Sequence, residues 1–150
     1  MKEKEVEEVF KNYKKELIKK LGRKALWNND IDKVCSELFG KQFVGCFPQD
    51  KMLVKSGFQV LNVDTSKEKG SHWVALFITS RTCYVYDSFA RPTPKLLKHL
   101  TKKLNEKKIK FKDSDRSDAE QRGDSEICGQ LSISWLCCVH KLGIKNALKI

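Results

Sequence analysis

The sequence has no long apolar run. Of its 150 residues, 40% are hydrophobic and 33% are charged, and no stretch approaches the roughly 18 apolar residues that a membrane-spanning helix needs. The first twenty residues, MKEKEVEEVFKNYKKELIKK, contain no unbroken apolar segment, so we expect neither a secretory signal nor a membrane partner. The length is typical of one domain that buries a core without cross-links. We therefore expect a single domain over 1–150.

Cys-x-x-Cys pairs are also absent, although the sequence contains six cysteines. Pairs at this spacing are typical of zinc sites, and Cys137, Cys138 and His140 are too crowded to replace them. We therefore expect no metal site. Because no export signal is expected, the thiols should be reduced, and five of the six are interpreted as small buried hydrophobic residues.

Acidic residues are too few to balance the basic ones. Nineteen Asp and Glu face thirty Lys and Arg, which leaves a formal net charge of +11. A field of this sign favours polyanions such as nucleic acid, although solubility alone is an equal explanation. The excess is concentrated in eight lysines, which form a candidate polyanion-binding surface: Lys95, Lys98, Lys102, Lys103, Lys107, Lys108, Lys110 and Lys112.

The spacing of apolar residues predicts helices over 2–21, from about 30 to 39, over about 94–106 and over 128–142. Asn28, Asn29 and Asp30 are the candidate N-caps of the second helix. Strands are predicted over 58–63, 72–79 and 82–88, with a short one over 108–111, while the segment FVGCFPQDKM is predicted to be turn-rich. This order of elements indicates an α+β domain.

One cysteine differs from the other five. Cys128 falls at the start of the last predicted helix, where unpaired N–H groups and the positive end of the helix dipole stabilise a thiolate. The next residue, Gly129, adds no side chain, so a substrate carbonyl can approach the backbone closely. Cys128 is therefore the candidate nucleophile.

A thiol nucleophile needs a base, and the sequence contains three histidines. His99 and His140 lie in the lysine-rich helix and near the end of the last helix, where structural or solvated roles are expected. His72 begins a strand and Asp87 ends the neighbouring hairpin strand, so an imidazole–carboxylate hydrogen bond is expected between them. Gln121, seven residues before the cysteine, is a candidate donor to an oxyanion.

Taken together, the segments GSHWVALF, CYVYDSFA and EQRGDSEICGQLSISWLCCVH resemble the adenovirus endopeptidase (adenain) family. Its relatives include proteases of large DNA viruses, virophages and Maverick/Polinton elements and, more remotely, the SUMO-specific proteases. The family order of His, acid, Gln and Cys falls on His72, Asp87, Gln121 and Cys128. The segments FVGCFPQDKM and YDSFARPTPKLL look most like the Maverick and virophage branch. The resemblance covers roughly residues 28–142, which the helix within 1–24 precedes.

The resemblance implies an adenain-like, papain-like fold, with a small and mostly antiparallel central sheet flanked by helices. The nucleophile would lie at the N-terminus of a buried helix. The implied activity is that of a cysteine endopeptidase that matures viral capsid or core precursor proteins at glycine-containing sites. Gln121 and the backbone N–H of Cys128 would hold the oxyanion. Trp73 and Gly129 would line a narrow substrate cleft.

The resemblance also sets expectations about activators, partners and location. No cofactor is required, while DNA and a non-covalently bound peptide are candidate activators. The covalent peptide activation of the adenovirus enzyme is not expected, because residues 109–121 contain no cysteine. We expect a monomer whose partners are capsid or core precursors and non-specific DNA, in the virion and in the cytoplasm or nucleus of infected cells.

Two alternatives stay open. A deSUMOylase- or deubiquitinase-like enzyme would keep the chemistry and act on ubiquitin-like tails. A basic nucleic-acid-binding module would keep the charge and leave the catalytic residues inert, although the lysine-rich segment lacks interleaved aromatic residues for base stacking. Thiol reactivity at Cys128 distinguishes this second alternative from either protease.

Overall fold

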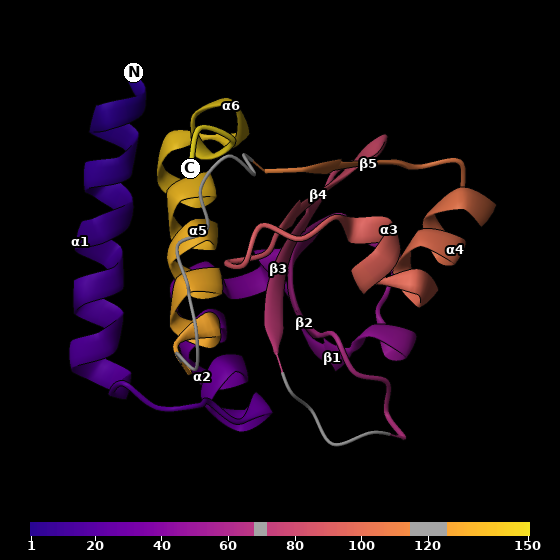
Figure 1. Cartoon of the computed structure of the whole chain (residues 1–150), viewed down its shortest axis with the longest axis horizontal. Coiled ribbons are helices and arrows are strands. Elements are labelled where there is room, and N and C mark those ends of the chain that lie inside the picture. Colours follow the sequence, from indigo (N-terminus) through magenta and orange to yellow (C-terminus); the bar gives the residue numbers. More distant parts are fainter. Residues whose placement is uncertain (68–71, 115–125) are drawn as a thin grey trace.

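The computed structural model describes residues 1–67, 72–114 and 126–150. A five-stranded sheet in the order β1–β2–β3–β4–β5 carries helices on both faces (Figure 1). The strands are β1 (Phe43–Pro48), β2 (Gly57–Asn62), β3 (Trp73–Ile78), β4 (Thr82–Tyr86) and β5 (Lys110–Asp113). The helices are α1 (Glu3–Leu21), α2 (Asn28–Phe39), α3 (Thr93–Leu96), α4 (Lys98–Glu106), α5 (Cys128–Leu142) and α6 (Ile144–Ala147), with short 3₁₀ turns η1 (Gly40–Gln42) and η2 (Gln49–Lys51). The α+β class is confirmed.

The sheet is mixed, so the expectation of a mostly antiparallel sheet is wrong. The central pairings of β2 with β3 and of β3 with β4 are antiparallel. The outer pairings of β1 with β2 and of β4 with β5 are parallel. Between β4 and β5 the chain passes through α3 and α4, and a crossover of this kind returns the chain in the same direction.

The segment expected to be turn-rich instead forms the edge strand β1 and the turn η2. The segment contains a glycine and a proline, residues that are unfavourable within a strand, and the sheet accommodates both. Gly45 lies at a β-bulge, where the register against β2 shifts and φ is +152°, and Pro48 ends a strand that has a neighbour on one side only. Proline and glycine are tolerated at sheet edges and bulges.

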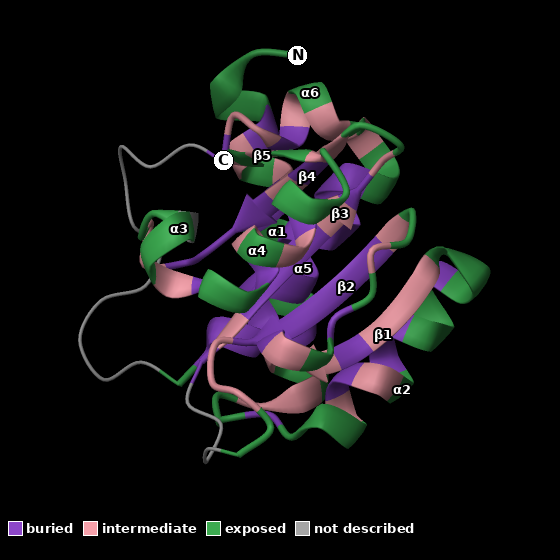
Figure 2. Ribbon diagram, turned by 90° about the vertical axis from the view of Figure 1, so that its right-hand side faces the viewer, coloured by how far each residue is buried: buried purple, intermediate pink, exposed green. Residues whose placement is uncertain are grey.

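Two layers of helix cover the sheet. On one face α5 packs against β3, with α1 along its outer side and α2 against β1, while α3 and α4 cover the other face (Figure 1). Alternation along β3 supports both layers, because Ala75 belongs to the α5 side and Val74 and Leu76 to the α4 side. Figure 2 shows α5 and the central strands buried between exposed outer elements. The buried centre therefore holds α5 in a fixed position.

The helix expected over about 94–106 is interrupted at Leu97, which has φ −125° and ψ 66°. The amide of the buried Gln49 occupies the interruption. Its Nε2 donates to the carbonyl of Leu96 at 3.3 Å, and its Oε1 accepts the N–H of His99 at 3.1 Å. A side chain from a distant segment thus satisfies the backbone groups that the break leaves, which apolar spacing within 94–106 cannot reveal.

Helix ends account for the smaller differences. Trp27 is the N-cap of α2, and Asp30 lies inside the first turn, where its carboxylate accepts the Trp27 N–H at 3.0 Å. The last strand begins at Lys110 because Lys108 has a φ of +57° and turns the chain. Helix α5 spans the predicted residues and is followed by α6, which we did not predict.

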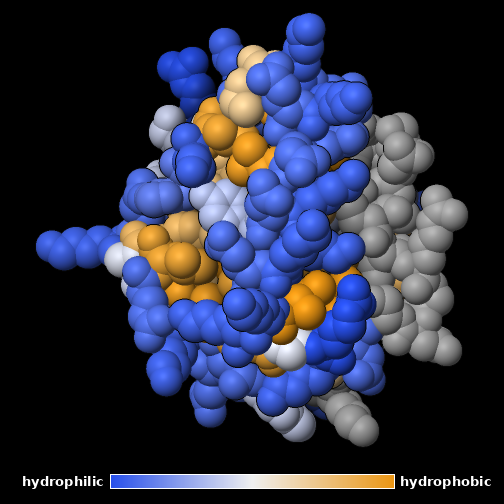
Figure 3. Space-filling view, turned by 90° about the vertical axis from the view of Figure 1, so that its left-hand side faces the viewer, coloured by the Kyte–Doolittle hydropathy of each residue, from blue (hydrophilic) through white to orange (hydrophobic). Residues whose placement is uncertain are grey.

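On the side where α1 lies, hydrophilic side chains dominate and separate small hydrophobic areas (Figure 3). Within the ranges that the structure describes, we find no helix that combines the length and the apolar character of a membrane span.

Candidate active site

His72 and Asp87 meet at one end of the β3–β4 hairpin. His72 directly precedes β3 and Asp87 directly follows β4, and because the two strands are antiparallel these ends lie together. The His72 Nε2 is 2.6 Å from the Asp87 Oδ1. Their side chains are only 7% and 3% exposed. The predicted pairing of these two residues is confirmed.

Cys128 completes the cluster from the other side. It is the first residue of α5, which packs against β3. The backbone N–H of Trp73 donates to the Cys128 Sγ at 3.4 Å, and the backbone N–H of Gly129 also lowers the pKa of this thiol. The neighbour of Trp73 is His72, whose ring interacts with the same thiol. Three residues predicted from separate segments are therefore brought together.

The three groups shift one another's ionisation. Burial raises the pKa of the Cys128 thiol, but His72 and the backbone N–H groups outweigh burial and lower it below its ordinary value. Burial opposes the charged form of His72, yet Asp87 and Cys128 raise its pKa. Burial raises the pKa of Asp87, but its bonds to His72 and Arg91 outweigh burial and lower the pKa to about 2. Relative to the ordinary values, these shifts favour the charged form of each of the three groups.

The other cysteines have the opposite environment. All six thiols are free and buried. Burial raises the pKa of Cys83, Cys137 and Cys138 to about 12, and it also raises those of Cys35 and Cys46. These five remain protonated and pack as apolar groups, which separates Cys128 from them as the sequence predicted.

The remaining histidines lie elsewhere. His99 is exposed near the start of α4. The ring of His140, near the end of α5, lies 5.5 Å from that of Phe39 and 6.2 Å from that of Phe58. Neither residue interacts with Cys128 in the manner of His72, in agreement with the structural or solvated roles expected of them.

A connector over residues 22–27 packs against Gly129 and Trp73, which are the sequence neighbours of Cys128 and His72. A Cβ added to Gly129 would lie 2.9 Å from the Leu26 side chain, so Gly129 is required for this close contact. The indole N–H of Trp73 donates to the Leu26 carbonyl at 3.0 Å. The expected substrate-cleft residues Trp73 and Gly129 are thus adjacent to Cys128, and Leu26 joins them.

Two residues, one in this connector and one that bonds to it, were not predicted. Trp27 is 77% exposed, an unusual state for so large an aromatic side chain. Gln130 is fully buried in α5, and its Nε2 donates to the carbonyls of Gly22 and Lys24, both at 2.8 Å. Gln130 thereby ties the connector to the nucleophile helix. In the sequence, the only sign of this role of Gln130 is a polar amide side chain two positions after the candidate nucleophile, within an apolar helix.

The two expected oxyanion donors are the Gln121 side chain and the backbone N–H of Cys128, and the structure describes only the second. Gln121 lies outside the described residues. Cys128 begins α5, and the first N–H groups of a helix have no partner within the helix. The backbone N–H of Cys128 is one of these groups, and its role as an oxyanion donor stays a prediction.

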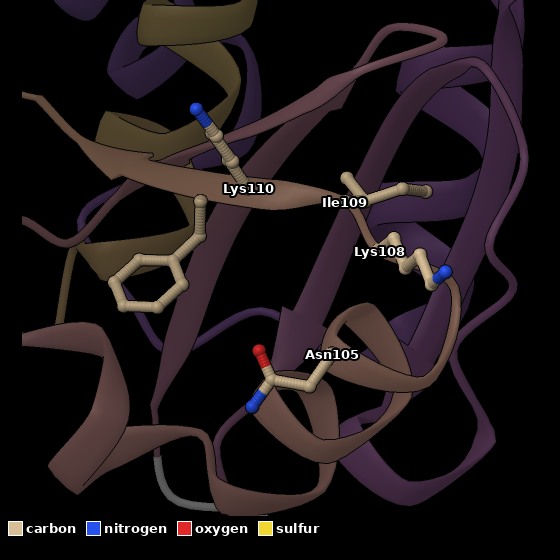
Figure 4. Close-up of a pocket in the computed structure, with 5 residues that line it drawn as sticks. Asn105, Lys108, Ile109 and Lys110 are labelled. Carbon is tan, nitrogen blue, oxygen red and sulfur yellow. The ribbon is translucent and has the colours of Figure 1, made fainter.

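The candidate polyanion surface is formed by lysines of α3, α4, the turn that follows α4, and the edge strand β5. Seven of its eight lysines are exposed. The exception is Lys103, whose Nζ donates to the carbonyls of Asp50 and Met52, both at 3.0 Å. Lys103 therefore has a structural role. Asn105, Ile109 and Phe111 line a surface pocket with Lys108 and Lys110, whose amines point away from each other (Figure 4).

Among the described residues, no three His, Cys, Asp or Glu side chains form a group that could hold a metal ion. No family model matches the chain, and no curated protein matches it. The functional argument therefore depends on the geometry and the electrostatics of the cluster.

Proposed function

We propose that this protein is a cysteine endopeptidase in which Cys128 is the nucleophile, His72 the general base and Asp87 the orienting acid. The observation that carries the proposal is the meeting of these side chains at the end of β3. A hydrogen-bonded His–Asp pair lies there beside the one cysteine whose pKa is lowered. A depressed thiol pKa beside a histidine is the property that thiol nucleophiles need.

The reaction follows from this arrangement. His72 takes the proton of Cys128, and the thiolate attacks the scissile carbonyl carbon. The negative charge that develops on the carbonyl oxygen is held by the N–H of Cys128 and by Gln121. His72 then gives its proton to the leaving amine. Water, deprotonated by His72, hydrolyses the thioester and restores the thiol. Asp87 fixes the ring tautomer and stabilises the imidazolium throughout.

The fold and the substrate are proposed from the sequence resemblance together with the cleft. A helix that begins at the nucleophile and packs on a central sheet is consistent with an adenain-like, papain-like protease. The close approach of Leu26 to Gly129 leaves little room over the residue that follows the nucleophile, which favours small substrate residues such as glycine. We therefore propose viral capsid or core precursors as substrates, and ubiquitin-like tails as the alternative.

The test is cleavage of candidate capsid precursors and of a ubiquitin-like precursor, with the new termini mapped by mass spectrometry. Cys128→Ala should abolish cleavage. Cys137→Ala is the matched control, because Cys137 lies in the same helix and is similarly buried. Cleavage by Cys128→Ala at the wild-type rate would refute the mechanism. Preference for the folded ubiquitin-like precursor would favour the alternative substrate.

A second proposed property is sequence-independent binding of DNA or another polyanion. The exposed lysines of α3, α4, the following turn and β5 support it, and the amines of Lys108 and Lys110 point away from each other instead of converging on one point (Figure 4). A spread of cations matches the regular charge of a nucleic-acid backbone better than it matches a small anion. Such binding would concentrate the protease inside an assembling particle.

A further inference from the structure

The carboxylate of Asp87 has partners on both oxygens. Oδ1 lies 2.6 Å from the His72 Nε2 and accepts the Phe89 N–H at 3.2 Å. Oδ2 accepts the backbone N–H of Arg91 at 3.1 Å and its Nε at 2.9 Å. One side of the carboxylate therefore serves His72, and the other side is held by a residue that the proposed mechanism does not use.

The turn from Asp87 to Arg91 is shaped for this contact. The Ala90 N–H donates to the Asp87 carbonyl at 2.8 Å, which closes the turn. Ala90 itself has a φ of +57°, a left-handed conformation that is uncommon for alanine. Such a conformation persists where surrounding bonds impose it. Here those bonds bring Arg91 back to the carboxylate at the start of the turn.

Arg91 also contacts Phe89, whose ring packs against the His72 imidazole. The ring of Phe89 lies 4.9 Å from that of His72, and the Arg91 Cζ lies 5.0 Å from the centre of the Phe89 ring. Arg91 thus contacts both residues that contact the His72 ring on this side, the carboxylate at its nitrogen and the phenyl ring. The Arg91 side chain remains 43% exposed, so it connects the buried pair with the solvent.

We propose that Arg91 is a positioning residue of the proposed protease, which fixes the Asp87 carboxylate toward His72 and holds Phe89 against the imidazole ring. Terminal carboxylate torsions are soft, and a fork of N–H donors on one oxygen defines the orientation of the other. Arg91 also keeps the buried carboxylate ionised. The titratable groups that interact with the His–Asp pair are Cys128, from α5, and Arg91 itself.

The inference rests on the proposed function but can be tested without a substrate. The probe is iodoacetamide, and the measurement is the rate of Cys128 alkylation against pH, with the modified cysteine located by mass spectrometry. Arg91→Met keeps the length of the side chain and removes the cation. Arg91→Lys keeps the charge. Arg81→Met is the matched control, because Arg81 is an exposed arginine in the β3–β4 turn.

In the wild type, alkylation should have its midpoint below the ordinary thiol pKa of 9.0. Arg91→Met should raise the midpoint, and each unit of rise lowers the thiolate fraction about tenfold at a pH below the midpoint. Arg91→Lys should restore much of the shift, and Arg81→Met should leave the midpoint unchanged. On a peptide substrate, Arg91→Met should lower kcat about tenfold with little change in KM, since Arg91 acts through the base.

The two proposals fail in different ways. A wild-type midpoint near 9 would overturn the proposed nucleophile and, with it, the role of Arg91. A low wild-type midpoint that Arg91→Met leaves unchanged would overturn the role of Arg91 alone. Equal shifts in Arg91→Met and Arg81→Met would also overturn it, because general loss of positive charge would then explain the effect.

Discussion

Replacement of Asp87 by Asn should change how stability depends on pH. The ordinary pKa of an aspartate is 3.8, and bonds from His72 and Arg91 lower that of Asp87 to about 2 against the effect of burial. The folded state therefore binds this proton more weakly than the unfolded state. The resulting stabilisation is fully present above pH 3.8 and is lost as the pH falls through 2.

The size of the effect follows from the shift. The difference between 3.8 and about 2 is close to two units, which corresponds to about 2 kcal/mol at pH 6. Asp87→Asn should therefore be about 2 kcal/mol less stable than the wild type at pH 6, and the gap should fall to about 1 kcal/mol near pH 2.5.

Urea unfolding at a series of pH values measures the gap directly. Asp32→Asn is the control, because burial raises the pKa of Asp32 and gives its pH dependence the opposite sign. A gap between wild type and Asp87→Asn that stays constant from pH 6 to pH 2.5 would refute the reasoning.

The same substitution tests the proposed chemistry. The Asn side chain offers one acceptor oxygen in place of two, and the fork of Arg91 competes for it. An amide N–H would then face the His72 Nε2 and favour the wrong imidazole tautomer. Peptide cleavage should fall about 10²- to 10⁴-fold, while Cys128 remains in place.

Three further predictions follow from other contacts. Gln130→Leu removes the bonds to the carbonyls of Gly22 and Lys24 and should lower the free energy of unfolding by about 1–2 kcal/mol in urea titrations; an unchanged value would show that the tie is not needed. Trp27→Ala should raise KM for a long peptide more than for a short one if the exposed indole contacts substrate, and equal KM values would contradict that contact. A variant in which four lysines of the polyanion surface are replaced by Glu should bind duplex DNA more weakly and with a smaller salt dependence, measured by fluorescence anisotropy. Its cleavage of a short peptide should stay unchanged. An unchanged DNA affinity would leave solubility as the explanation of the charge. The four positions are Lys102, Lys107, Lys108 and Lys110, and Lys103 is spared because it bonds to two carbonyls.

The sequence was most informative where one local pattern decides the structure. Apolar spacing located α1 and α5, and the tight turn between β3 and β4 placed His72 and Asp87 at one end of the hairpin. That placement is a consequence of antiparallel pairing, so it required no knowledge of the rest of the fold. The meeting of Cys128 with this pair depended on the family resemblance as well.

The features that the sequence did not predict depend on distant partners. β1 contains a glycine and a proline that are acceptable only because the strand lies at an edge. The break between α3 and α4 depends on Gln49, some fifty positions away in the chain. Arg91 and Gln130 resemble ordinary surface and helix residues until the carboxylate and the carbonyls that they bind are known. Tertiary contacts, not local propensity, decide each of these features.

Trp73 has a consequence for attempts to change specificity. Its backbone N–H donates to the Cys128 sulfur, its carbonyl accepts the Ser132 hydroxyl at 3.2 Å, and its indole N–H donates to the Leu26 carbonyl. The connector backbone at Leu26, the Cys128 sulfur and α5 are therefore coupled through one residue. A change of specificity that displaces the connector backbone should also change the environment of Cys128, whereas a substitution of the Leu26 side chain keeps the carbonyl that Trp73 binds.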